Sequence, residues 1–280
     1  MVTSTTMQNA EKVDLAIIGA GNYADISSAV PITVTNASSL AGWYGLMVAK
    51  TYLEFHPFVS IVVLEAADSV GGVWAQHRLY PGLKSNNMLG TYEYPDFPMD
   101  EKTFDVKPGQ FIPGHVIHDY LTQFARKSGV YERIRFGIKV NTVERLEKGG
   151  WLLRLTARKG QGSCIAEKLV VATGVTSEPF MPVLEGSQSF GAPIFHVKAL
   201  SQHNETMKTA NEVVVLGGTK SAWDAAYAFA EAGGSAQVHM VIRETGHGMS
   251  KLQRNMLGFY ICPYHISQAR YGWLLPTSHR

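Results

Sequence analysis

Two segments of this sequence decide its fold: VDLAIIGAG at residues 13–21 and GWYGLMVAKTYLE at residues 42–54. The first is a short apolar run that stops at two glycines, as a buried parallel strand does where it enters a tight turn. The second has the apolar spacing of a helix and carries a further glycine near its start. Joined without residues 22–42, the two segments form a Gly-x-Gly-x-x-Gly fingerprint between a strand and a helix.

This fingerprint is the phosphate-binding turn of dinucleotide-binding proteins. Gly19 makes the tight turn, Gly21 lets backbone amides approach a pyrophosphate, and Gly45 allows the helix to pack closely on the strand. The helix N-terminus adds a partial positive charge toward the phosphates. A second strand at residues 59–67 reaches Glu65 about 20 residues after Gly45, where an acid accepts the ribose hydroxyls. The two strands and the acid make the fingerprint far more specific than the glycines alone.

The fingerprint is interrupted by residues 22–42, a polar stretch rich in Val, Thr and Ser. A loop here would move the amides near Gly21 away from the helix N-terminus, although the pyrophosphate needs both. Codons for Gly21-Asn22, Thr35-Asn36 and Ala41-Gly42 can spell the donor, branch-point and acceptor sequences of an intron, in that order. We therefore favour the hypothesis that residues 22–42 are a translated, retained intron over a genuine loop insertion, and sequencing the transcript would decide between them.

The same plan of strand, glycine turn, helix and strand returns at residues 212–244. Gly217 is the tight-turn glycine and Gly218 follows it, but Thr219 stands where a second fingerprint glycine is expected. Ser221 then opens the helix. Two such units in one chain predict an α/β fold built from two Rossmann-like dinucleotide-binding units.

Arg243 ends the second strand of this later unit, at the place that Glu65 has in the first. An arginine there favours the 2′-phosphate of NADPH, because a guanidinium pairs well with phosphate oxygens and an acid would repel them. The alternative interpretation is a solvated arginine at the end of a strand.

The chain between the two units shows three kinds of pattern. Residues 71–113 are rich in Gly, Pro, Asn and aromatic side chains and carry little periodicity, which favours a long ligand-contacting loop. Residues 115–130 have the spacing of an amphipathic helix, with Gly129 as its stop. Residues 131–174 alternate apolar and polar side chains and predict a meander of strands.

Composition excludes several classes of protein. The chain has 280 residues, 45% of them hydrophobic, which is enough for a sizeable core. Its 25 Lys and Arg nearly balance its 23 Asp and Glu, so no nucleic-acid partner is indicated. The two cysteines, Cys164 and Cys262, form no CxxC pair and no metal-ligand spacing, so no metal site is expected. No signal-peptide core and no apolar run long enough for a membrane span is present, and we expect a cytoplasmic protein.

Several further motifs, taken in order, resemble flavin-containing monooxygenases of the fungal secondary-metabolite type, which use FAD and NADPH. Beside the interrupted fingerprint, the motifs are LEAADSVGGVW at 64–74, YPGLKSNNMLGTYEYPDFPM at 80–99, VVATG at 170–174, VVVLGGTKSAWDAA at 213–226 and VIRETGHG at 241–248. The resemblance runs from about Val13 to Gly248, and the ordered set is more specific than any single motif.

The resemblance implies an FAD-binding domain at residues 1–178, with residues 22–42 inserted in its glycine motif, and an NADPH-binding domain at 179–280. It implies oxygenation of a small, secondary-metabolite-like substrate by O₂ through a C4a-hydroperoxyflavin. Asn86 would be the catalytic residue near the flavin ring, and a simple Asx turn is the alternative. Cofactor binding would fall to Gly19, Gly21, Gly45, Glu65, Gly72, Trp74, Asn86, Thr173, Gly174, Gly217, Gly218, Ser221 and Arg243.

The sequence also departs from this family. The family's fingerprint between the domains, FxGxxxHxxx(W/F), survives only in Phe190 and His196, because Ala192 replaces the expected glycine and Leu200 the expected aromatic residue. The resemblance would make His196 a hinge between the cofactor domains, and a packed or capping histidine is the alternative. Family members are longer, so we expect that the NADPH domain is truncated and that the C-terminal part of the FAD domain is missing. The alternative function is therefore a non-catalytic truncated remnant or mis-spliced product. A flavin disulphide reductase would need a CxxC pair, which the two cysteines do not supply.

Overall fold

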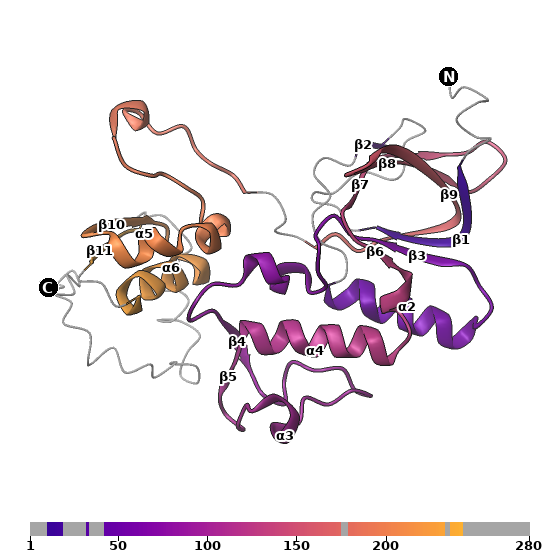
Figure 1. Ribbon diagram of the computed structural model, residues 1–280, viewed down its shortest axis with the longest axis horizontal. Helices are drawn as coiled ribbons and strands as arrows, with labels where there is room; N and C mark the ends of the chain where they lie inside the picture. Colours follow the sequence, from indigo (N-terminus) through magenta and orange to yellow (C-terminus); the bar gives the residue numbers. More distant parts are fainter. Residues whose placement is uncertain (1–9, 19–31, 34–41, 175–178, 233–235, 243–280) are drawn as a thin grey trace, which may run out of the picture. The chain divides into compact units, whose positions relative to one another are not determined.

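The computed structural model describes residues 10–18, 32–33, 42–174, 179–232 and 236–242 (Figure 1). The chain divides into two units. Unit 1 comprises Met1–Leu79 and Lys84–Gly186, and unit 2 comprises Tyr80–Leu83 and Ser187–Arg280. The short segment Tyr80–Leu83 thus groups with unit 2, although the residues on both sides of it in the sequence belong to unit 1.

Unit 1 is built on a mixed seven-stranded sheet with the strand order β2-β7-β8-β9-β1-β3-β6. β1 pairs in parallel with both β3 and β9, and β3 pairs in parallel with β6. β7, β8 and β9 form an antiparallel meander, as their alternating sequence predicts. The strands are β1 Glu11–Ile18, β2 Ile32–Thr33, β3 Ile61–Leu64, β6 Ile134–Arg135, β7 Ile138–Arg145, β8 Trp151–Ala157 and β9 Gly160–Val171.

Two long helices accompany this sheet: α2, Trp43–Phe55, and α4, Gly114–Lys127. Both were predicted, and α4 ends as expected, because Gly129 has a φ of 67° and its amide donates to the carbonyl of Arg126. The stretch between β3 and α4 is mostly irregular, with short 3₁₀ helices at Gly72–Trp74 and Gln76–Arg78. It also contains β4 Lys84–Met88, α3 Glu101–Phe104 and β5 Phe111–Pro113.

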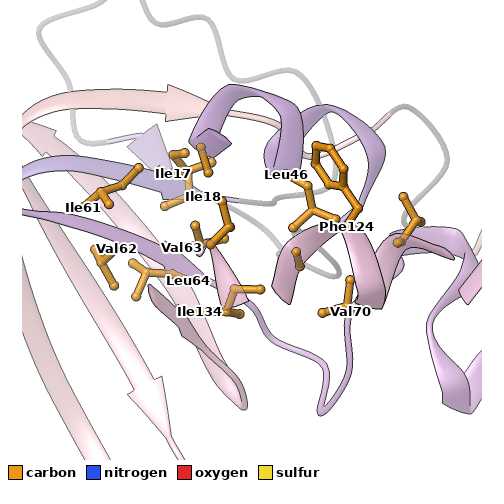
Figure 2. Close-up of a cluster of buried hydrophobic side chains, with 14 of the residues drawn as sticks. Ile17, Ile18, Leu46, Ile61, Val62, Val63, Leu64, Val70, Phe124 and Ile134 are labelled. Carbon is orange, nitrogen blue, oxygen red and sulfur yellow. The ribbon is translucent and has the colours of Figure 1, made fainter. Parts of the chain in front are cut away.

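The core of unit 1 lies between the parallel strands and the two long helices (Figure 2). All four residues of β3 are buried, as are the last four of β1, because both strands are covered on two faces. Leu46 of α2 and Phe124 of α4 are buried in the same cluster. Burial of each such side chain contributes about 2 kcal/mol, so this core holds the carboxyl ends of the strands in place.

Unit 2 contains the predicted second strand, turn, helix and strand. β10, Glu212–Leu216, pairs in parallel with β11, Gln237–Val241, and α6, Lys220–Glu231, connects them. Its core includes Leu200, Met207, Ala225 and Phe229. The α/β fold with two Rossmann-like units is thereby confirmed. The remaining described elements are α5, Asn204–Thr209, and 3₁₀ helices at Tyr131–Arg133, Ser187–Ser189 and Val197–Gln202.

His196 precedes the 3₁₀ helix at Val197–Gln202 and caps it, since its Nδ1 accepts from the amide of Lys198 at 3.1 Å. The capping role that the sequence left open for His196 is therefore what the structure shows. Leu200, which departs from the expected aromatic residue, is buried in the unit 2 core, whereas Phe190 is exposed. No helix in the described part of the chain combines the length and the apolar character needed to cross a membrane.

Candidate functional site

The carboxyl ends of three parallel strands mark the candidate site in unit 1. β1 ends at Ile18, level with Val171 of β9 and Leu64 of β3. Ligands of open α/β sheets bind outside this edge, because the loops that follow the strands diverge there. Gly19 and Gly21, the first two fingerprint glycines, follow directly and lie outside the described residues.

Thr173 and Gly174 lie at this same edge. The amide of Ala172 donates to the carbonyl of Ile18 at 2.7 Å, which carries the pairing of β9 with β1 one residue past the strand. Gly174 has a φ of 69°, a conformation that favours glycine. The structure therefore places both residues just past the end of β1, and their role in binding a cofactor stays a prediction.

The N-terminus of α2 faces the segment that follows β3. Gly42 is the N-cap residue, and its carbonyl accepts from the amide of Leu46 at 3.1 Å. Among the described residues no side chain caps this end, and the first turn contains no acidic residue. The amides of the first turn therefore keep their positive partial charge for an anion. Gly45 is buried within the helix, as the third fingerprint glycine should be.

Gly42 is a site residue that the sequence analysis missed. A Cβ at this position would lie 3.2 Å from the Cα of Gly72, so the two backbones meet with no side chain between them. Gly42 is the last of residues 22–42, the segment that interrupts the fingerprint. In the structure it stands one residue before Trp43, where the joined fingerprint places Gly21. The signal was present in the sequence, because Gly42-Trp43-Tyr44-Gly45 has the same spacing as Gly21 would have with Gly45 after the deletion.

Glu65 follows β3 directly and is completely buried. Its backbone is held from both sides, because its amide donates to the carbonyl of Arg135 at 3.0 Å and its carbonyl accepts from Ile138 at 2.9 Å. Its side chain turns toward the following loop, and Oε1 accepts from the amide of Ala67 at 2.7 Å. A buried carboxylate at the end of this strand is the arrangement in which an acid accepts ribose hydroxyls.

The turn from Gly71 to Trp74 completes the site in unit 1. Gly71 has a φ of 126° and Gly72 a φ of 66°, and the amide of Trp74 donates to the carbonyl of Gly71 at 2.9 Å. A Cβ on Gly71 would lie 2.7 Å from the backbone of Trp74, so this turn requires glycine. Together with Gly42 it forms a cradle of bare backbone at the start of α2. These residues fit the pyrophosphate end of a dinucleotide, which needs close backbone approach.

An aromatic cluster supports this turn, and sequence reasoning did not find it. Trp43, the first residue of α2, stacks on Tyr92 with ring centroids 4.0 Å apart. The Tyr94 hydroxyl donates to the carbonyl of Trp43 at 2.6 Å, and the Tyr120 hydroxyl accepts from the amide of Tyr94 at 2.6 Å. Burial raises the pKa of Tyr94 and of Tyr120 well above the usual value, so both remain protonated donors. The concentration of aromatic residues in 92–97 is the sequence signal that could have predicted this cluster.

Asn86 lies in the middle of β4 with its side chain exposed. The strand pairs with β5 with an irregular register between Lys84 and Met88, and an Asx turn at Asn86 stays the alternative interpretation. The buried side chain next to it, Ser85, bonds to the Asn87 carbonyl and accepts from the amide of Ile112. The described contacts do not bring Asn86 to the edge of the seven-stranded sheet, and its catalytic role stays a prediction.

Unit 2 carries its own glycine turn. Gly217 has a φ of 142°, and its amide donates to the carbonyl of Val241 at 3.0 Å. A Cβ at Gly217 would lie 3.3 Å from the Cβ of Ala222, so the small residue at each place allows the turn to pack on α6. Gly218 follows, Thr219 is the N-cap without a side-chain bond, and Ser221 is exposed in the first turn. Arg243 lies outside the described residues.

A polar cluster lies on α6 behind this turn. Asp224 forms an ion pair with Lys220, and it accepts from the Tyr80 hydroxyl at 3.4 Å. Desolvation raises the pKa of the Asp224 carboxyl, and the neighbouring Lys220 opposes that shift. The lysine therefore points along α6 toward Asp224, one turn further on.

Comparison with known proteins identifies the family. The profile of the family described as pyridine nucleotide-disulphide oxidoreductase matches residues 45–257, a match that begins at the third fingerprint glycine. An FAD-dependent monooxygenase of Aspergillus nomiae is 39% identical over 227 residues, covering 76% of this chain and 38% of the relative. One of Aspergillus sclerotiorum is 39% identical over 219 residues, covering 76% and 37%.

Solved structures agree with the fold. Tmm from a Pelagibacter species aligns with a TM-score of 0.63 at 25% identity and covers 84% of this chain and 51% of that one. S-allyl-L-cysteine S-oxygenase from Allium sativum aligns with a TM-score of 0.61 at 22% identity and covers 85% and 52%. In length, the chain spans less than half of the two fungal relatives named above. It belongs to the pyridine nucleotide-disulphide oxidoreductase family, and its resemblance to flavin monooxygenases is confirmed.

Proposed function

We propose that this chain is the cofactor-binding part of an FAD-dependent monooxygenase that uses NADPH and O₂ to oxygenate a small molecule of the secondary-metabolite class. The observation that carries the proposal is the bare backbone around the start of α2. There Gly42 and Gly72 meet with no side chain between them, and no described side chain caps the helix. This arrangement suits an anionic ligand that contacts the backbone. The names of the fungal relatives support FAD as that ligand.

The residues that would hold FAD can be assigned from this geometry. The first-turn amides of α2 and the Gly71–Gly72 turn would contact the pyrophosphate, and Glu65 would accept the ribose hydroxyls. Trp74 would lie along the flavin, and Thr173 and Gly174 would border it beside β1. When bound, the flavin supplies the oxygen chemistry, and the protein binds it, orients it and excludes water.

Unit 2 would hold NADPH by the same physical principles. Gly217 and Gly218 would allow the pyrophosphate to approach the backbone at the start of α6. Ser221 is exposed in the first turn of this helix and would contact a phosphate. Arg243 would pair with the 2′-phosphate.

Replacing Arg243 by serine is therefore expected to lower the preference for NADPH over NADH about tenfold, as loss of one charge-assisted phosphate contact does. Steady-state oxidation of both nucleotides measures this ratio. A ratio equal to that of the parent chain would favour the solvated-arginine interpretation.

The direct test is purification of the chain after expression with excess flavin. The proposal expects a yellow protein with a flavin absorption band, FAD released on denaturation, and NADPH oxidation that depends on the protein. A colourless protein that binds no added FAD and oxidises no NADPH would contradict it. That result would support the second candidate, a non-catalytic remnant, which the interruption of the fingerprint by residues 22–42 favours.

Replacing Glu65 by glutamine is expected to weaken FAD binding about tenfold or more, because a hydrogen bond to a charged acceptor is worth about 1.5–3 kcal/mol. The amide oxygen of glutamine can still accept from Ala67, so the loop after β3 is expected to keep its shape. Titration of the apoprotein with FAD measures the change. Glu167→Gln, at an exposed position of β9, is the matched control and is expected to bind FAD like the parent. If both variants bind FAD with equal affinity, Glu65 does not bind the ribose.

A further inference from the structure

Trp74 is held at two atoms by residues from other parts of unit 1. Its indole Nε1 donates to the Tyr92 hydroxyl at 3.2 Å, which orients the ring. Its backbone carbonyl lies 3.2 Å from Nδ1 of His118, on α4. A carbonyl oxygen can only accept a hydrogen bond. In this contact Nδ1 of His118 is therefore the protonated nitrogen, and its N–H donates a hydrogen bond to the carbonyl of Trp74. One contact therefore fixes the side chain, and the other fixes the backbone that carries it.

Tyr92 is itself held by a stacking contact. Its ring stacks on Trp43 with an interplanar angle of 10°, at the first residue of α2. Trp43 is in turn tied through its carbonyl to the hydroxyl of Tyr94, a fully buried side chain. The orientation of the Trp74 indole is thereby linked to the N-terminus of the helix that forms the bare-backbone cradle.

Such support is needed because the two residues that begin the turn before Trp74 are glycines and have no side chains to hold it. Gly71 and Gly72 both have positive φ values, and glycines retain the widest backbone freedom in the absence of external contacts. Trp74 is only partly buried, so packing alone does not hold it. A ring that is to lie against a flat cofactor must have a defined plane, which a hydrogen bond at Nε1 supplies.

We propose that Tyr92 and His118 are positioning residues, which hold the indole of Trp74 in the plane that the flavin needs. This inference rests on the proposed function. In this inference, Tyr92 orients the indole ring of Trp74, and His118 holds the backbone turn that carries it.

Conservative variants separate positioning from a general contribution to the fold. Tyr92→Phe keeps the ring that stacks on Trp43 and removes only the acceptor for the indole. His118→Leu removes the donor to Trp74, whereas His118→Asn places an amide nitrogen near the former Nδ1 and restores it. Tyr131→Phe is the matched control, because the described contacts of the Tyr131 side chain involve only its ring, with Phe136 and Arg126.

The first measurement needs no flavin. In protein labelled with ¹⁵N at the tryptophan indoles, the Trp74 signal is assigned by its loss in Trp74→Phe. Tyr92→Phe is expected to shift this signal upfield in the proton dimension and to speed its exchange with water, and Tyr131→Phe is expected to leave it unchanged. An unchanged Trp74 signal in Tyr92→Phe would overturn the inference by itself.

The second measurement is titration with FAD, followed by the quenching of flavin fluorescence. Tyr92→Phe and His118→Leu are each expected to weaken FAD binding roughly three- to tenfold, as loss of one hydrogen bond does, and to reduce the quenching of the bound flavin. His118→Asn is expected to restore both. If the Trp74 signal moves but affinity and quenching equal those of the parent, the positioning role is refuted. Failure of the parent chain to bind FAD would instead contradict the proposed function, and the inference would fall with it.

Discussion

Replacing Gly71 by alanine is expected to destabilise unit 1 by about 3 kcal/mol or more and to abolish measurable FAD binding. The added Cβ would lie 2.7 Å from the carbonyl carbon and oxygen of Trp74 and 2.8 Å from the amide nitrogen of Ala75. All these atoms are backbone, so no side chain can rotate away. The φ of 126° adds strain that a residue with a Cβ does not tolerate. Denaturant unfolding followed by tryptophan fluorescence measures the loss of stability.

Gly109→Ala is the matched control for this variant. Gly109 also has a positive φ, of 80°, but a Cβ there would meet no described atom within 4 Å. It is expected to cost only about 1 kcal/mol, from backbone strain alone. If the two variants lose the same stability, the close contact at Gly71 is not what makes glycine necessary there.

Deleting residues 22–42 is expected to tighten FAD binding by about a hundredfold. The deletion joins Gly21 directly to Trp43 and restores an uninterrupted fingerprint. Two backbone amides would then reach the pyrophosphate together, and each hydrogen bond to a charged group contributes about 1.5–3 kcal/mol. The deletion also removes β2, which pairs with β7 at the edge of the sheet, so a loss of about 1 kcal/mol in stability is expected alongside. FAD titration and denaturant unfolding of both chains measure the two effects.

The position of Gly42 supplies the outcome that would contradict this prediction. Gly42 already occupies the N-cap of α2, against Gly72. It would therefore allow the close approach of backbone and pyrophosphate that the fingerprint assigns to Gly21. Equal FAD affinity with and without residues 22–42 would show that the interruption is tolerated. A chain in which residues 24–31 are replaced by a Gly-Ser repeat of equal length is the control. It keeps the separation and is expected to bind FAD like the parent.

Most of the fold was predictable because short-range patterns encode it. The run before Gly19 and the run before Glu65 are apolar throughout, and the structure buries the ends of both strands on two faces. The apolar spacing in 115–130 predicts α4, and the alternation after Tyr131 predicts the meander. The same logic found Gly217, because a glycine at the end of a strand marks a turn that no other residue makes easily.

The candidate site was predicted only in part. Glu65 was predicted from its spacing after a strand, whereas Gly72 and Trp74 were predicted from the resemblance to flavin-containing monooxygenases. Tyr92 and His118 were missed because no spacing rule joins them to Trp74, and their contacts exist only once α4 and the loop before it have packed. His196 could be read as a hinge or as a cap, and only its bond to the Lys198 amide decided between them.

The sequence by itself determined the two strand–turn–helix units and the family to which the chain is related, because these depend on periodicity and on glycines at fixed places. The tertiary structure alone decided that Gly42, from the interrupting segment, caps α2, since the contact with Gly72 joins residues far apart in the chain. It alone revealed the aromatic cluster that ties Trp74 to α2. Contacts of this kind depend on how elements pack against one another, which local patterns do not encode.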